Sequence, residues 1–134
     1  MVVLYVAGIA STIIFFFVFF IFGETPVSKY ETVDVDVAYD LIEKSSEELQ
    51  ILDVRTPEEY QSEHIHDAIN VNVRDPDFEN QISTFKEDMP VLVYCRSGVR
   101  SESAASILAS KGFKEIYNMQ GGIESWKRAG YQVE

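Results

Sequence analysis

Val91-Leu92-Val93-Tyr94 is a run of four apolar residues that leads directly into Cys95-Arg96-Ser97-Gly98-Val99-Arg100-Ser101, and a helical pattern follows from 102 to 111. A buried strand, a short polar loop and the start of a helix together form an anion-binding cradle. The reason is that backbone N–H groups at a helix N-terminus lack partners and carry partial positive charge. Gly98 allows successive N–H groups to point inward. We therefore predict an anion-binding loop at the end of this strand.

Cys95 is the only cysteine of the chain and is expected to stand at the mouth of this loop. A helix N-terminus and basic neighbours lower the pKa of a thiol from about 8.5 to roughly 3.5–7.5. The helix end contributes about 0.3–2 kcal/mol, whereas an arginine about 4 Å away contributes roughly 4 kcal/mol before desolvation. Arg96 and Arg100 are therefore the larger influence if they point inward. We interpret Cys95 as a thiolate nucleophile for an anionic substrate, with an inert buried thiol as the alternative.

The composition limits the classes of partner. The chain has 134 residues and a formal net charge of −11, and every Asp, Glu, Lys and Arg lies after residue 22. This length corresponds to one ordinary domain. The acidic balance argues against binding to nucleic acid. A single cysteine excludes an internal disulfide and leaves the redox compartment open.

Residues 2–22 form an uncharged apolar run, from Val2 to Phe22. A helix of roughly 21 residues is about 31 Å long, which is enough to cross a hydrocarbon core of about 30 Å. We predict a single-pass membrane anchor at 1–23, a linker at 24–30 and a folded domain at 31–134. A cleaved signal peptide is the alternative, but the run has no basic start and no small-residue cleavage site. Lys29 alone favours a cytoplasmic domain, so the side of the membrane stays open.

Strand and helix patterns alternate through the rest of the chain. Strands are expected at 32–35, 49–54, 69–73, 91–94 and 113–119, with helical patterns between them. Such alternation predicts an α/β domain of three layers, in which a mainly parallel central sheet has helices on both faces. Ligands bind such sheets at the carboxyl ends of the strands. Cys95 and the segment 53–55 both follow predicted strands, so we expect them at the same edge.

Four motifs occur in order between about residue 30 and the end of the chain. They are Leu52-Asp53-Val54-Arg55-Thr56-Pro57-Glu58-Glu59-Tyr60, His64-Ile65 with Ala68-Ile69-Asn70-Val71, the segment 93–101, and Gly121-Gly122-Ile123 with Trp126. Together they resemble the rhodanese-like superfamily. The chain departs from that pattern at Glu63, where the family usually has Gly, and at His66-Asp67, where it usually has Pro-Gly.

The resemblance implies a rhodanese-like fold and sulfurtransferase activity. Cys95 would take a sulfane sulfur from a small anionic donor such as thiosulfate, become a persulfide, and pass the sulfur to a thiol or protein acceptor. Arg96 and Arg100 would hold the donor, and the backbone from Arg96 through Ser97, Gly98, Val99 and Arg100 to Ser101 would stabilise the persulfide. The six residues from Cys95 to Arg100 match the short loop of the sulfurtransferases, because the related cell-cycle phosphatases have one residue more.

Other functions remain possible on the sequence alone. A membrane-tethered persulfide relay or docking module for a protein partner is one alternative, and a phosphatase or arsenate reductase is another. Asp53 and Arg55 are expected to support the site by locking the end of a strand. Capping of a helix explains Glu59. We predict no cofactor beyond the covalent persulfide and no metal site, because His64 and His66 lack partners with ligand spacing.

Overall fold

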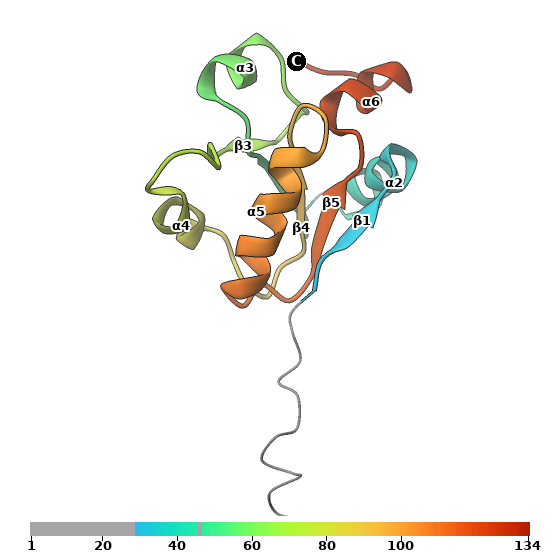
Figure 1. The fold of residues 1–134 in the computed structure, drawn as a ribbon. Helices are drawn as coiled ribbons and strands as arrows, with labels where there is room; N and C mark the ends of the chain where they lie inside the picture. The colour runs from blue at the N-terminus through green and yellow to red at the C-terminus, as the bar shows by residue number, and fades with distance from the viewer. Residues whose placement is uncertain (1–28, 46) are drawn as a thin grey trace, which may run out of the picture.

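One parallel sheet forms the centre of the domain. The structure is a computed structural model that describes residues 29–45 and 47–134. The sheet has the order β1-β5-β4-β2-β3, and each pair of neighbouring strands is parallel (Figure 1). The strands are β1 (Glu31–Val33), β2 (Gln50–Asp53), β3 (Ile69–Asn70), β4 (Val91–Tyr94) and β5 (Ile116–Met119). The predicted sheet is therefore confirmed within the part of the chain that the structure describes.

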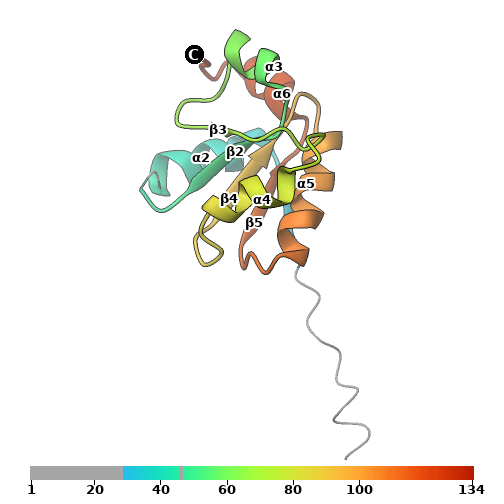
Figure 2. The same ribbon diagram turned by 90° about the vertical axis from the view of Figure 1, so that its left-hand side faces the viewer.

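Helices cover both faces of the sheet, which confirms the α/β class. They are α2 (Val35–Ser45), α3 (Pro57–Ser62), α4 (Phe78–Gln81), the 3-10 helix η1 (Ile82–Thr84), α5 (Val99–Ser110) and α6 (Gly122–Arg128). Figures 1 and 2, two views that differ by a rotation of 90°, show α2 and α5 on opposite faces of the sheet. α4 packs in the same buried cluster as α5, and α6 packs with α2.

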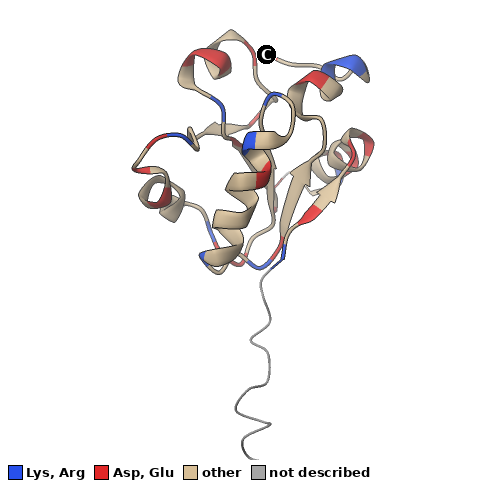
Figure 3. Ribbon diagram, viewed as in Figure 1, with Lys and Arg blue, Asp and Glu red and all other residues tan. Residues whose placement is uncertain are grey.

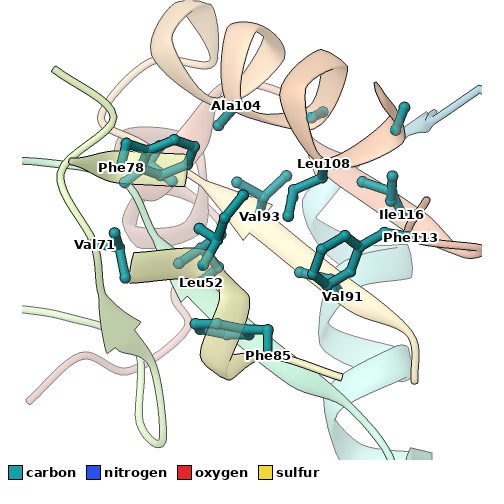
Figure 4. Close-up of a cluster of buried hydrophobic side chains, with 14 of the residues drawn as sticks. Leu52, Val71, Phe78, Phe85, Val91, Val93, Ala104, Leu108, Phe113 and Ile116 are labelled. Atoms are coloured by element: carbon teal, nitrogen blue, oxygen red, sulfur yellow. The ribbon is translucent and has the colours of Figure 1, made fainter. Parts of the chain in front are cut away.

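Strand β4 supplies both halves of the core because all four of its residues are buried. Val91 and Val93 face Leu108 of α5 and Phe113, in the cluster shown in Figure 4. Leu92 and Tyr94 face the other cluster, which contains Trp126. Full burial of a side chain of this size contributes roughly 1.5–3 kcal/mol. The continuous apolar run is thus explained by a sheet that is covered on both faces.

The structure shortens two predicted strands. The strand expected at 113–119 is β5, Ile116–Met119. The segment expected at 69–73 contains only β3, at Ile69–Asn70. The amide of Asn70 donates to the carbonyl oxygens of Asp53 and Arg55, at 3.0 and 2.9 Å. A side chain that bonds the neighbouring backbone in this way competes with a regular ladder. Nearby, Asp67 has φ 63 at the position where the family usually has glycine, so the departure keeps a left-handed turn.

The predicted anchor at 1–23 and residues 24–28 of the linker lie outside the described residues. Among residues 29–45 and 47–134, no helix has the length and apolar character needed to cross a membrane. The described chain enters the sheet through β1, at the amino edge of the parallel strands, whereas Cys95 follows β4 at the carboxyl edge. The predicted catalytic loop and the start of the domain therefore lie at opposite ends of the sheet (Figure 1).

Candidate active site

The loop after β4 is shorter than expected because α5 begins at Val99 and not near Glu102. Gly98 is the N-cap residue, with φ 107, and the N–H of Glu102 donates to its carbonyl oxygen at 3.2 Å. Arg100 and Ser101 therefore belong to the first helical turn, whose N–H groups have no partner within the helix. The left-handed angle at Gly98 turns the chain earlier than a side chain would allow.

The thiol of Cys95 lies under this loop. Cys95 is only 1% exposed. The prediction that its sulfur stands at the mouth of the loop is therefore wrong. The N–H of Gly98 donates to Sγ at 3.0 Å. Sγ lies 3.4 Å from Oγ of the buried Ser101, whose hydroxyl donates to the carbonyl oxygen of Gly98 at 3.1 Å. In this arrangement Sγ accepts from the N–H of Gly98 and donates to Oγ of Ser101.

The environment lowers the pKa of Cys95. Burial alone raises it, but hydrogen bonds from the Ser101 hydroxyl and from the N–H groups of Ser101, Gly98 and Ser97 outweigh burial and favour the thiolate. The expectation that arginine charge would be the larger influence is therefore corrected. The loop acts on the sulfur mainly through hydrogen bonds, and the charged ends of both arginines are held elsewhere.

Arg96 and Arg100 are both paired with carboxylates. The Arg96 side chain is largely exposed, and its Nε lies 2.7 Å from Oε1 of Glu124. Arg100 makes a bidentate pair with Glu59, at 2.7 Å from Nη1 to Oε1 and 2.9 Å from Nη2 to Oε2. Figure 3 shows acidic segments of α3 and α6 on either side of the basic start of α5. Val99, the remaining predicted loop residue, is 74% exposed.

Asp53 and Arg55 form a buried ion pair at the end of β2. Arg55 donates from Nε and Nη2 to the carboxylate of Asp53, with the shortest distance 2.7 Å, and from Nη2 to the carbonyl oxygen of Glu63 at 2.6 Å. Its guanidinium carbon lies 5.7 Å from the ring centroid of Tyr94. Burial and the carboxylate of Asp53 raise the pKa of Tyr94. The pair thus holds the residue before Cys95 and keeps its hydroxyl protonated.

The start of helix α6 is hydrogen-bonded to the backbone of the loop. The N–H of Ile123 donates to the carbonyl oxygen of Cys95 at 2.9 Å, and the N–H of Glu124 donates to that of Arg96 at 3.1 Å. Gly122 has φ 60 and is buried. These bonds fix the first two residues of the loop, and they use N–H groups that the start of α6 leaves unpaired.

A cleft of about 240 Å³ opens beside the loop. Its lining is polar and carries both signs of charge, with the residues Arg55, Glu59, Ser62, Glu63, Arg96, Ile123, Glu124 and Lys127. Lys127 pairs with Glu63 across the cleft. The cleft therefore joins α3, α6 and the loop in one polar site.

Glu59 and Glu124 are the site residues that sequence reasoning missed. The capping box at the start of α3 is confirmed, since Thr56 accepts from the N–H of Glu59 and donates its own N–H to Oε1. Capping gave a complete explanation of Glu59, and no local pattern indicated a partner 41 residues away. Glu124 follows the glycine pair closely in the sequence, but no motif indicated that it would contact Arg96.

The comparisons with known proteins agree with this geometry. The sequence profile of the rhodanese-like domain matches residues 34–129. The chain is 35% identical over 98 residues to the thiosulfate sulfurtransferase GlpE of Coxiella burnetii, with 73% of this chain and 88% of the relative covered. It is 34% identical over 103 residues to the thiosulfate sulfurtransferase GlpE of Vibrio cholerae, with 76% and 92% covered.

A solved structure gives the same result for the fold. The rhodanese-related protein of Thermoplasma volcanium superposes with a TM-score of 0.68 at 28% identity, covering 78% of this chain and 98% of that one. The region matched by the profile, residues 34–129, contains strands β2 to β5, the loop after β4 and all of α6. The chain therefore belongs to the rhodanese-like domain family.

Proposed function

We propose that the protein carries sulfane sulfur as a persulfide on Cys95, from a small anionic donor such as thiosulfate to a thiophilic acceptor. Sulfurtransferase as the enzyme class follows from the family and from relatives at about 35% identity. The observation that carries the finer proposal is the position of Sγ, with the N–H of Gly98 at 3.0 Å and Ser101 Oγ at 3.4 Å. Such donors favour a thiolate before the reaction and a persulfide anion after it.

The first step is an attack by the Cys95 thiolate on the outer sulfur of thiosulfate. A new S–S bond forms on Cys95, the S–S bond of the donor breaks, and sulfite leaves with the electron pair. Because sulfite is a stable anion, the step needs no general acid. In the reactive state the Ser101 hydroxyl turns from the carbonyl oxygen of Gly98 to the anionic sulfur.

The second step returns the thiolate. An acceptor thiolate attacks the terminal sulfur of the persulfide, takes it as its own persulfide, and leaves Cys95 with the electron pair of the broken bond. Cyanide does the same and yields thiocyanate. The residues of the loop need no change of protonation between the two steps, because they stabilise an anionic sulfur throughout.

The test is thiocyanate formation from thiosulfate and cyanide. Cys95→Ser should abolish it, with Ser103→Ala on the exposed face of α5 as the matched control. Equal activity of Cys95→Ser and the wild type would remove Cys95 from the reaction. Cys95-dependent hydrolysis of an aryl phosphate without thiocyanate formation would instead favour the phosphatase alternative.

A relay to one protein partner gives a different pattern. In that case Cys95 would carry one additional sulfur atom in the protein as isolated, with negligible turnover of thiosulfate and cyanide. Intact-protein mass measurement separates the two cases, because one chain has one thiol.

The apolar run at 2–22 supports a membrane anchor for this domain. With the anchor joined to β1 at the amino edge of the sheet, the loop at the carboxyl edge would meet acceptors from the aqueous side and not from the lipid. An impermeant thiol reagent on intact cells tests the side, with lysed cells as control. Labelling of intact cells would contradict a cytoplasmic domain.

A further inference from the structure

Arg100 is already neutralised in the free protein. Its two guanidinium nitrogens face the two oxygens of Glu59 at 2.7 and 2.9 Å, and the two side chains are only 17% and 30% exposed. A bidentate pair of this kind is among the stronger charge-assisted interactions. An anionic donor that approaches Arg100 therefore meets a cation whose charge is balanced by Glu59 and whose two terminal nitrogens both donate to that carboxylate.

Thr56 also holds the carboxylate of Glu59 in place. Its Oε1 accepts from the N–H and the hydroxyl of Thr56, at 3.3 and 3.2 Å. The hydrogen bond from Arg100 lowers the pKa of Glu59 to about 2, so the group remains ionised at every physiological pH. A fixed and permanently charged carboxylate can hold Arg100, and it repels anions that enter the adjoining cleft, which it lines.

The second arginine of the loop is paired in a weaker way. Arg96 meets Glu124 through one nitrogen, and its side chain is 68% exposed. Exposed pairs of this type contribute about 0–1 kcal/mol and exchange partners readily. Glu59 is therefore the carboxylate with the larger effect on an anion that binds between the loop and α3.

We propose that Glu59 sets the selectivity of the enzyme for the charge of the sulfur donor, because its fixed negative charge beside Arg100 repels a donor in proportion to the charge that the donor carries. The proposal rests on the sulfurtransferase function above and adds a residue to it. Two oxygens on the tetrahedral sulfur of such a donor can accept together from a guanidinium, as two oxygens of a phosphate do, so a donor that displaces Glu59 replaces one bidentate pair by another. The energy of the pair is then subtracted from donor binding.

Glu59→Gln removes the charge and leaves the helix cap. Glutamine at this position of a capping box accepts the same hydrogen bonds from Thr56, so α3 is expected to stay folded. Glu58→Gln, an exposed carboxylate in the same turn, is the matched control. We compare KM for two donors with the same reacting S–S bond, thiosulfate as a dianion and methanethiosulfonate as a monoanion.

The expected result follows from Coulomb's law, since the repulsion scales with the donor charge. In Glu59→Gln, KM for thiosulfate falls about tenfold and KM for methanethiosulfonate about threefold, with little change of either in Glu58→Gln. Unchanged or higher KM values, or an equal change for both donors with a lower kcat, would overturn the proposal and leave Glu59 as a residue that only positions the loop.

Binding without chemistry separates this proposal from the function itself. In a Cys95→Ser background, calorimetric titration with thiosulfate should show tighter binding when Glu59→Gln is added, whatever the turnover of the wild type. Should Glu59→Gln fail to fold, Arg100→Gln in the same background gives the second test. Because this variant leaves the charge of Glu59 unbalanced, it should weaken binding of thiosulfate more than binding of methanethiosulfonate, and equal weakening of both would contradict the proposal.

Discussion

A Cβ atom on Gly122 would lie 2.4 Å from the carbonyl oxygen of Cys95 and 2.5 Å from the carbonyl group of Arg96. Real Cβ atoms do not approach a backbone so closely, and neither neighbour is the end of a flexible side chain. The first residue of α6 therefore has to be glycine for the loop to lie where it does. The contact connects the glycine pair at the end of the chain with the position of the thiol.

Gly122→Ala should displace the loop and remove most of the activity. The substitution combines a positive φ, which costs a non-glycine residue about 1–2 kcal/mol, with overpacking of about 1–3 kcal/mol. Thermal or urea unfolding and the thiocyanate assay measure the two effects.

Gly130→Ala is the matched control because Gly130 also has a positive φ, of 89°, but a Cβ there would meet nothing within 4 Å. It should cost only the backbone strain and leave the turnover of the folded protein unchanged. Equal loss of activity in both variants would mean that the contact under the loop has no part in catalysis.

Ser101→Ala should move the pH dependence of Cys95 to higher pH. The Ser101 hydroxyl is the leading group that lowers the pKa of this thiol, against the opposing effect of burial. Without it the thiolate fraction at neutral pH decreases, and a rate that depends on the thiolate rises only at higher pH. Alkylation by iodoacetamide reports the thiol directly, because Cys95 is the only cysteine. An unchanged profile would remove Ser101 from the stabilisation of the thiolate.

Asp53→Asn should destabilise the domain without changing the chemistry of the folded protein. The substitution leaves the Arg55 guanidinium buried and without its carboxylate, and loss of one partner of a buried pair costs about 3–5 kcal/mol. Asp40→Asn, which breaks the exposed pair with Lys44, is the control and should leave the urea midpoint unchanged. A loss of kcat at full stability would instead place Asp53 among the reacting groups.

The sequence predicted the sheet well because its signals are local. Apolar runs mark β2 and β4, and Thr56 through Glu59 specify their own helix start. The start of α5 was harder to predict, since no apolar period includes Val99 or Arg100 and only the angle at Gly98 turns the chain there.

Pairing across the site could not be predicted from any single motif. Arg100 and Glu59 come from different helices, and their contact depends on how α3 packs beside the loop. Arg96 and Arg100 were expected to act directly on the thiol. In the structure they pair with carboxylates of α6 and α3, and only the packing of these helices beside the loop decides that pairing. The capping box explained Glu59 by itself, so no sequence pattern indicated its contact with Arg100.

Cys95 is proposed to carry the sulfur, and intact-protein mass measurement tests this role most directly. After incubation with thiosulfate and removal of the excess, the wild-type protein should gain the mass of one sulfur atom, and cyanide should remove that gain while thiocyanate forms in equal amount. Cys95→Ser should gain nothing. A folded wild-type protein that forms thiocyanate without the mass gain at Cys95, or a Cys95→Ser protein that gains it, would contradict the account.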